Sequence, residues 1–271
     1  MNTTYMATAL CGGFLLVAAA GDSAAESIKK GKAALVAGKA EDAIRHLTDA
    51  IRADPKNAEA HYHRARAFQL ATRMGEAMAD LSEAIKLDPK FTKAYVERGT
   101  LYLAQSILPD GKSALPKAVA DLTEASRLAP RDAGPLYHRA LARYEAGEYA
   151  EAIADLDRAI RLESEEPALH LDLARVLAVC PEAKYRDGRR AVKAATKACE
   201  LTGWKEPLAL ESLAAGYAEA GKFGDAVKWQ RRAVEVLTVG GFDAFKKRAE
   251  VRLREYERGK PVRYRSLLRW Y

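Results

Sequence analysis

Two histidines and a repeated tetrapeptide are the first candidates for chemistry in this sequence. His61 and His63 stand two positions apart, and the tetrapeptide Tyr-His-Arg-Ala at residues 62–65 returns at residues 137–140. Metal ligands on one helix prefer spacings of three or four, because only those spacings put both side chains on one face. A spacing of two therefore favours histidines on the surface of a repeated unit over a metal site.

Gly111-Lys112-Ser113 matches the last three residues of a phosphate-binding loop. That loop also needs a glycine five positions before Gly111, where this chain has Ser106, and no apolar strand precedes it. We therefore expect a polar loop here. The sequence also lacks the motifs HExxH and GxSxG and a glycine-rich dinucleotide loop. We predict that the protein is not an enzyme and has no catalytic residues, no cofactor and no metal.

The composition is that of a globular, mostly helical protein. The chain has 271 residues, of which 49% are apolar and 30% charged, so it can bury a large core. Aromatic residues make up only 8%, while alanine is abundant and proline is scarce. This balance favours helices over sheets.

The N-terminus differs from the rest of the chain. Residues 1–23 contain no Lys, Arg or Glu, and their apolar run is short for a membrane span and ends in Ala18 and Ala20. This pattern is typical of an export signal cut before Gly21, although it lacks a basic start. An uncleaved anchor and a disordered segment are the alternatives. A cleaved signal would remove Cys11 and place the protein in the periplasm or cell envelope; otherwise the protein would be cytoplasmic.

A period of 34 residues runs through the sequence. Pro55 and Pro89 are 34 positions apart, and the next copy is stretched by seven residues between Gly99 and Ala118. Two periods and these seven residues make the 75 positions that separate the two Tyr-His-Arg-Ala copies. The tetrapeptide therefore recurs because a structural unit recurs.

This period, with small residues at fixed places, resembles the tetratricopeptide repeat, whose unit is two closely packed helices. Counted from the start of each unit, position 20 is alanine in every unit: Ala43, Ala77, Ala118, Ala152, Ala191 and Ala226. Position 27 is alanine too: Ala50, Ala84, Ala125, Ala159, Ala198 and Ala233. The resemblance implies an all-α fold, a right-handed superhelical solenoid of antiparallel helix pairs with about six repeats and a C-terminal capping helix.

The sequence predicts the following organisation after the N-terminal segment. The six repeats have the boundaries 24–57, 58–91, 92–132, 133–166, 167–206 and 207–240. The third and fifth carry loop-like insertions between their helices. Residues 241–257 form the capping helix, and residues 258–271 form a basic, aromatic tail. The capping helix places these residues on one apolar face: Phe242, Phe245, Ala249, Leu253 and Tyr256.

The segments CPEAKYRDGRRAVKAATKACELTGW, AAGYAEAG and RLREYERGKP resemble a block near the C-terminus of many bacterial tetratricopeptide repeat proteins. Cys180 and Cys199 belong to this block and would stand at opposite ends of an antiparallel helix pair. At about 1.5 Å of rise per residue they would lie more than ~10 Å apart, beyond the ~7 Å limit for a disulfide. We predict two reduced, buried thiols.

In tetratricopeptide repeat proteins the first helix of each unit lines a concave groove, so the resemblance implies a protein or peptide partner. Tyrosine and arginine, which anchor many interfaces, are among the implied groove residues. Asparagine is absent from these positions, which argues against the carboxylate clamp of the chaperone-binding members. The predicted groove residues are Lys29, Lys32, Glu59, Tyr62, His63, Arg66, Gln69, Lys93, Glu97, Thr100, Tyr137, His138 and Tyr144.

The basic character of the chain lies at its C-terminus. Residues 246–271 hold ten Lys or Arg and three Glu, and this net charge of +7 equals that of the whole chain. Such a tail suits an anionic membrane, an anionic polymer or an acidic protein, whereas export argues against nucleic acid. A second hypothesis is therefore an envelope-associated structural protein that docks through its tail; a solvated tail folded over the capping helix is the simpler alternative. The basic tail residues are Arg258, Lys260, Arg263, Arg265 and Arg269.

Overall fold

The computed structural model describes residues 23–108, 111–264, 266 and 267, and these residues form α-helices and two 3₁₀ helices without any strand. The all-α prediction is confirmed. The predicted signal, residues 1–22, lies outside the described residues. The first helices of the six pairs are α1 (Ala24–Val36), α3 (Ala58–Leu70), α5 (Thr92–Ser106), α7 (Ala133–Ala146), α9 (Pro167–Val179) and α11 (Pro207–Glu219). Their partners are α2 (Ala40–Ala53), α4 (Met74–Leu87), α6 (Leu115–Leu128), α8 (Tyr149–Leu162), α10 (Gly188–Leu201) and α12 (Phe223–Val239), and α13 (Asp243–Glu257) follows them.

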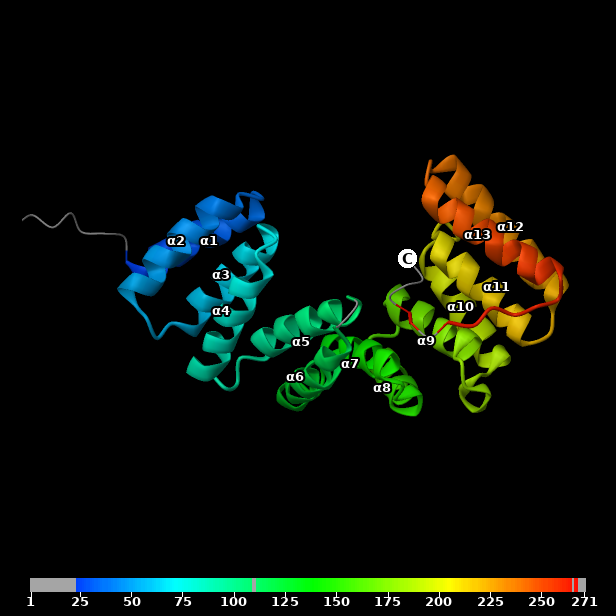
Figure 1. Cartoon of the computed structure of the whole chain (residues 1–271), viewed down its shortest axis with the longest axis horizontal. Helices are drawn as coiled ribbons and strands as arrows, with labels where there is room; N and C mark the ends of the chain where they lie inside the picture. The colour runs from blue at the N-terminus through cyan, green and yellow to red at the C-terminus, as the bar shows by residue number, and fades with distance from the viewer. Residues whose placement is uncertain (1–22, 109–110, 265, 268–271) are drawn as a thin grey trace, which may run out of the picture.

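The pairs follow one another along an arch, from α1 and α2 at one end to α12 and α13 at the other (Figure 1). Each second helix packs on the first helix of the next pair, as α2 does on α3 and α6 on α7. This arrangement is the helical solenoid of repeats that the period of 34 predicts. No helix in the described part of the chain is both long enough and apolar enough to cross a bilayer.

The columns of small residues lie where helices touch. Every alanine at position 20 and position 27 is fully buried. Gly31 and Gly99 occupy position 8, and a methyl group added there would lie 2.5 Å from Leu47 Cγ and 2.7 Å from Leu122 Cγ, respectively. The small side chains are therefore required for close packing, as predicted.

Proline ends the second helices of the first three repeats. Helices α2, α4 and α6 each stop two residues before Pro55, Pro89 and Pro130. A proline ring disfavours helical conformation in the preceding residue, so these positions separate one repeat from the next. Asn57 then starts α3 by accepting a hydrogen bond from the Ala60 amide at 3.0 Å.

Both predicted insertions contain a short 3₁₀ helix, η1 (Gly111–Ala114) and η2 (Ala183–Tyr185). Gly111 packs against the end of α5, where a methyl group would lie 1.8 Å from the Gln105 carbonyl oxygen. This contact gives the glycine a packing role, while Lys112 and Ser113 are exposed, so the predicted polar loop is a short 3₁₀ turn anchored by Gly111.

Cys180 and Cys199 are free and buried, as predicted. Burial raises the pKa of both thiols, and that of Cys199 reaches about 12.

The capping helix α13 packs on α12, with Ala249 and Tyr256 buried. The expectation that Phe242 and Phe245 share this buried face is wrong, because their exposed fractions are 53% and 42%. Arg252 is buried instead. Its guanidinium donates to Glu211 Oε1 on α11, and Gln230 of α12 donates to the same oxygen at 3.2 Å. An ion pair therefore joins the last helix to the stack.

Candidate functional site

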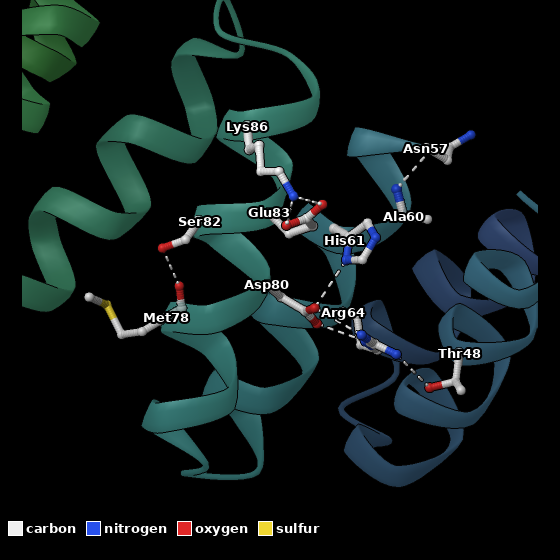
Figure 2. Close-up of polar contacts among 10 residues, drawn as sticks. All are labelled: Thr48, Asn57, Ala60, His61, Arg64, Met78, Asp80, Ser82, Glu83 and Lys86. Atoms are coloured by element: carbon white, nitrogen blue, oxygen red, sulfur yellow. Dashed lines mark hydrogen bonds and ion pairs between the residues drawn. The ribbon is translucent and has the colours of Figure 1, made fainter. Parts of the chain in front are cut away.

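The repeated Tyr-His-Arg-Ala motif supplies an arginine that joins three helices. Arg64 on α3 donates from Nε to Asp80 Oδ2 at 2.7 Å and from Nη2 to Asp80 Oδ1 at 2.8 Å (Figure 2). Its Nη1 reaches Thr48 Oγ1 of the preceding repeat at 3.2 Å. Burial disfavours the charged form of Asp80, but hydrogen bonds from Arg64 and His61 outweigh it, so the pKa of this carboxyl lies below its ordinary value.

The same arginine bridge recurs in the next two repeats. Arg98 pairs with Asp121 at 2.7 and 2.8 Å and also reaches Ser82, and Arg139 does the same with Asp155 and Thr123. The bridge holds neighbouring repeats in register, so the second tetrapeptide recurs for a structural reason. His61 is buried beside Asp80, with 3.1 Å between Nδ1 and Oδ1. The prediction that His61 lies on the surface is therefore wrong. In the described residues no group of three or more His, Cys, Asp or Glu could hold a metal ion.

The concave face of repeats 1 to 3 carries three shallow hollows. One has a volume of about 640 Å³ between α3 and the start of α5, and another of about 540 Å³ lies between α1, α3 and α5. Lys32, His63 and Arg66 line both of them, so the two hollows are continuous. A third hollow, of about 530 Å³, lies at the start of α1, and Lys32 lines it too. The predicted groove residues that line these hollows are Lys29, Lys32, Glu59, Tyr62, His63, Arg66, Gln69, Lys93 and Glu97.

Several of these groove residues pair with one another. Lys32 Nζ lies 2.9 Å from Glu59 Oε1, and His63 Nε2 lies 3.3 Å from the same oxygen. The hydrogen bond from Lys32 lowers the pKa of Glu59. Burial, followed by the charge of Lys32, lowers the pKa of His63, so this imidazole is neutral at pH 7. Gln69 Nε2 donates to Glu97 Oε2 at 3.3 Å.

Three cations on this face have no such partner. Lys29, Arg66 and Lys93 are exposed, and none of them forms a hydrogen bond or ion pair with the part of the chain that the structure describes. Arg66 and Lys93 line the same hollow as the rings of Tyr62 and Phe91, whose centroids are 5.0 Å apart, and Lys29 lines the adjoining hollow at the start of α1. The open part of the concave face can therefore receive an anionic group beside an aromatic surface.

The other four predicted groove residues lie away from these hollows. Thr100 donates to the Glu97 carbonyl oxygen at 2.8 Å, and Tyr137 donates to Asp172 Oδ2 at 2.9 Å. His138 is half-buried, and burial lowers its pKa. Tyr144 is fully buried and donates through its hydroxyl to the carbonyl oxygen of Tyr264 at 2.7 Å. Tyr144 is therefore covered by the C-terminal tail.

The tail returns along the concave face of repeats 4 to 6. After α13 the described chain crosses α11 and reaches α9 (Figure 1). We call residues 259–264, 266 and 267 the return segment. Its residues Val262, Tyr264 and Leu267 pack with the core formed by α7 to α12, and Leu267 is 1% exposed.

The return segment does not lie over the capping helix alone, as the solvated-tail alternative expects. It lies mainly on α9 and α11, where Arg263 Nη2 pairs with Glu219 Oε2 of α11. Val262 also packs with the apolar cluster that holds Tyr256 of the capping helix. Arg258 pairs with Glu255 at 3.1 Å, and Lys260 is exposed. Arg265 and Arg269 lie outside the described residues. The physical reason is α9 itself, whose two charged side chains, Asp172 and Arg175, pair with each other and are buried, so its concave side must be covered as well.

The family model described as "Tetratricopeptide repeat" matches residues 28–90, 97–167 and 137–179, which together cover more than half of the chain. The protein belongs to the tetratricopeptide repeat family. No curated protein matches its sequence.

Solved structures share the fold of this tetratricopeptide repeat protein at low sequence identity. PilF of Pseudomonas aeruginosa is 20% identical with a TM-score of 0.65, covering 82% of this chain and 96% of that one. MamA of Desulfovibrio magneticus RS-1 is 22% identical with a TM-score of 0.58, covering 69% and 98%. YrrB, a tetratricopeptide repeat protein with an unusual peptide-binding site, is 18% identical with a TM-score of 0.56, covering 70% and 91%.

Two features of this tetratricopeptide repeat protein were not predicted from its sequence. The arginine bridge has a signal there, because arginine at position 7 and aspartate at position 23 occur together in repeats 2 to 4 only. The return segment has a weaker one: residues 171–180 hold only two charged side chains, Asp172 and Arg175, so this helix has little polar surface to face water.

Proposed function

We propose that this tetratricopeptide repeat protein is a non-enzymatic scaffold that binds an extended, acidic segment of a partner protein on the concave face of repeats 1 to 3. One observation carries the proposal: the hollows there form a continuous surface that is open and holds three cations without partners among the described residues. The corresponding face of repeats 4 to 6 is filled by the return segment. The peptide-binding site of YrrB, which shares the fold, supports the same kind of ligand.

The chemistry of the open face suits a peptide that carries carboxylates. Arg66 can hold a carboxylate with two parallel hydrogen bonds. Lys93 adds positive charge in the same hollow, and Lys29 adds it in the adjoining one. Tyr62 and Phe91 offer an apolar surface between them. Because Glu59 is already paired with Lys32, it repels an acidic ligand less than a free carboxylate would.

Charge reversal tests this proposal. Wild-type protein and the variant Arg66→Glu/Lys93→Glu are titrated against an array of acidic and basic peptides, with Arg131→Glu as the matched control. Arg131 is an exposed cation that lines none of the hollows described above. We expect acidic peptides to bind the wild type and the control, and the double variant to lose at least ~10-fold in affinity, about 1.4 kcal/mol.

Salt gives an independent check, since binding by exposed cations must weaken as ionic strength rises. Acidic peptides that bind the double variant as tightly as the wild type would refute the proposed surface.

A second candidate function is docking on an anionic membrane or polymer, and α13 supplies the observation that favours it. Phe242 and Phe245 are exposed beside the exposed cations Lys247 and Arg248. Sedimentation with vesicles of phosphatidylglycerol and phosphatidylcholine tests this candidate. It predicts that deletion of residues 258–271, or Lys247→Glu/Arg248→Glu, releases protein from the vesicles; equal sedimentation of all three proteins would exclude it.

Export remains a proposal that rests on residues 1–23. N-terminal sequencing of the protein from its native cell tests it. A mature chain that begins near Gly21 supports export, and a chain that begins at Met1 in the cytoplasm contradicts it.

A further inference from the structure

The return segment is bound as an extended peptide would be, through its main chain. The Tyr264 amide donates to the Val179 carbonyl oxygen at 3.1 Å, and its carbonyl oxygen accepts from the Tyr144 hydroxyl at 2.7 Å. The Leu267 amide donates to Glu145 Oε1 at 2.7 Å, and its carbonyl oxygen accepts from Arg175 Nη2. Because these contacts use only the main chain of the segment, any residue except proline could make them at positions 264 and 267.

The groups that hold this main chain are themselves fixed. Arg175 is 1% exposed, and its Nη1 donates to Asp172 Oδ1 at 2.7 Å. Asp172 also accepts a hydrogen bond from Tyr137 at 2.9 Å. An arginine that Asp172 already orients before the peptide arrives loses less conformational entropy on binding it.

Side chains add selectivity at three positions. Leu267 is buried in the apolar core of repeats 4 to 6, where a polar residue would be costly. Arg263 pairs with Glu219, which also pairs with Arg186 at 3.0 Å. Tyr264 packs against the same core. The surface therefore favours a peptide with a basic residue, then an aromatic residue and, three positions after the aromatic residue, a leucine.

We propose that the concave face of α7, α9 and α11 is a second peptide-binding site, selective for the pattern Arg-aromatic-x-x-Leu, and that the chain's own C-terminus occupies it as a competing ligand. A partner segment with this pattern binds only when it displaces the return segment. The site is separate from the hollows of repeats 1 to 3, so it does not depend on the function proposed for them.

Tethering sets the strength of this competition. A ligand on a short linker has an effective concentration of about 1 mM, so a free peptide of about 10 µM intrinsic affinity would bind the intact chain about 100-fold more weakly than a chain without the tail. Release of the return segment would therefore act as a switch for the second site.

The test compares the intact chain with a chain that ends at Arg258. A fluorescent peptide with the sequence of residues 260–271 is titrated by anisotropy into each protein, after circular dichroism has established that both are folded. We expect saturable binding to the shortened chain, at least ~10-fold weaker binding to the intact chain, and no binding of a peptide with the change Leu267→Asp. The variant Arg131→Glu leaves these affinities unchanged.

Equal affinities for the shortened and intact chains, or equal binding of the peptide with the aspartate, would overturn the proposal. If the shortened chain does not fold, the intact variant Leu267→Asp gives the same answer, since a weakened return segment must let the labelled wild-type peptide bind more tightly. An unchanged affinity for that variant would also overturn it.

Discussion

Arg98 on α5 and Asp121 on α6 form a two-pronged ion pair, with Nε–Oδ2 and Nη2–Oδ1 distances of 2.7 and 2.8 Å. The side chains are 18% and 10% exposed, so the pair is mostly removed from water. The hydrogen bonds that Arg98 donates to Asp121 raise the pKa of Arg98, and its third guanidinium nitrogen reaches Ser82 of the preceding repeat at 3.1 Å. The pair therefore joins two repeats as well as two helices.

Removal of one partner should be costly. Arg98→Met leaves the Asp121 carboxylate without its partner, and we expect the free energy of unfolding in urea to fall by about 3 kcal/mol. The double variant Arg98→Met/Asp121→Leu removes both charges and should recover most of this loss. A double variant as unstable as the single one would show that the packing of Arg98, not the ion pair, stabilises the repeats.

Position 8 gives a prediction about packing. A methyl group at Gly99 would lie 2.7 Å from Leu122 Cγ, in a part of the core that is fully buried. Gly99→Leu should therefore cost about 1–3 kcal/mol by overpacking. Gly75, which has open space around it, is the control: Gly75→Ala should stabilise the protein by up to about 1 kcal/mol. Thermal unfolding of both variants measures the contrast, and equal effects would contradict the packing assigned to position 8.

Two histidines, one buried and one half-buried, make stability depend on pH. Burial lowers the pKa of His63 and of His138 below the ordinary value of 6.5. The unfolded chain therefore takes up these protons first, so stability that is present above pH 6.5 is lost as the pH falls through 6.5 toward the folded-state values. Unfolding in urea between pH 7.5 and pH 5 should show this decline.

The variant His138→Phe tests the assignment, because it removes one of the two groups. Its free energy of unfolding should change less between pH 7.5 and pH 5 than that of the wild type. An unchanged dependence on pH would exclude His138 as a contributor.

The buried thiols should resist modification. Burial raises the pKa of Cys199 to about 12 and also raises that of Cys180, and only the thiolate reacts with alkylating agents. A chain that begins at Ala24 should react slowly with iodoacetamide at pH 8 when folded and at both cysteines in guanidinium chloride. Mass spectrometry counts the adducts, and rapid labelling of the folded chain would contradict this burial.

The fold was predictable because its causes are local and periodic. The alanines at positions 20 and 27 and the prolines after the second helices repeat at 34 residues, and the structure buries those alanines and ends those helices as expected. The apolar face of the capping helix was only half right, because the buried ion pair of Arg252 with Glu211 depends on side chains 41 residues apart.

The site was less predictable than the fold. Position in the repeat was enough to place Lys32, His63 and Arg66 together on the concave face. It could not show that Tyr144 is covered, because its partner Tyr264 is 120 residues away in a tail without any repeat pattern. Contacts between a repeat and a segment outside the repeats follow no period, so only the three-dimensional structure shows them.

The central claim is that partners bind the open concave face of repeats 1 to 3. Photo-crosslinking in the native cell tests this claim directly, with a photoreactive amino acid at position 66, at position 93 or, as a control, at position 131. We predict crosslinks to a common partner, through an acidic segment, from positions 66 and 93 and none from position 131. Crosslinks that arise equally from position 131, or that are absent from positions 66 and 93, would contradict the claim.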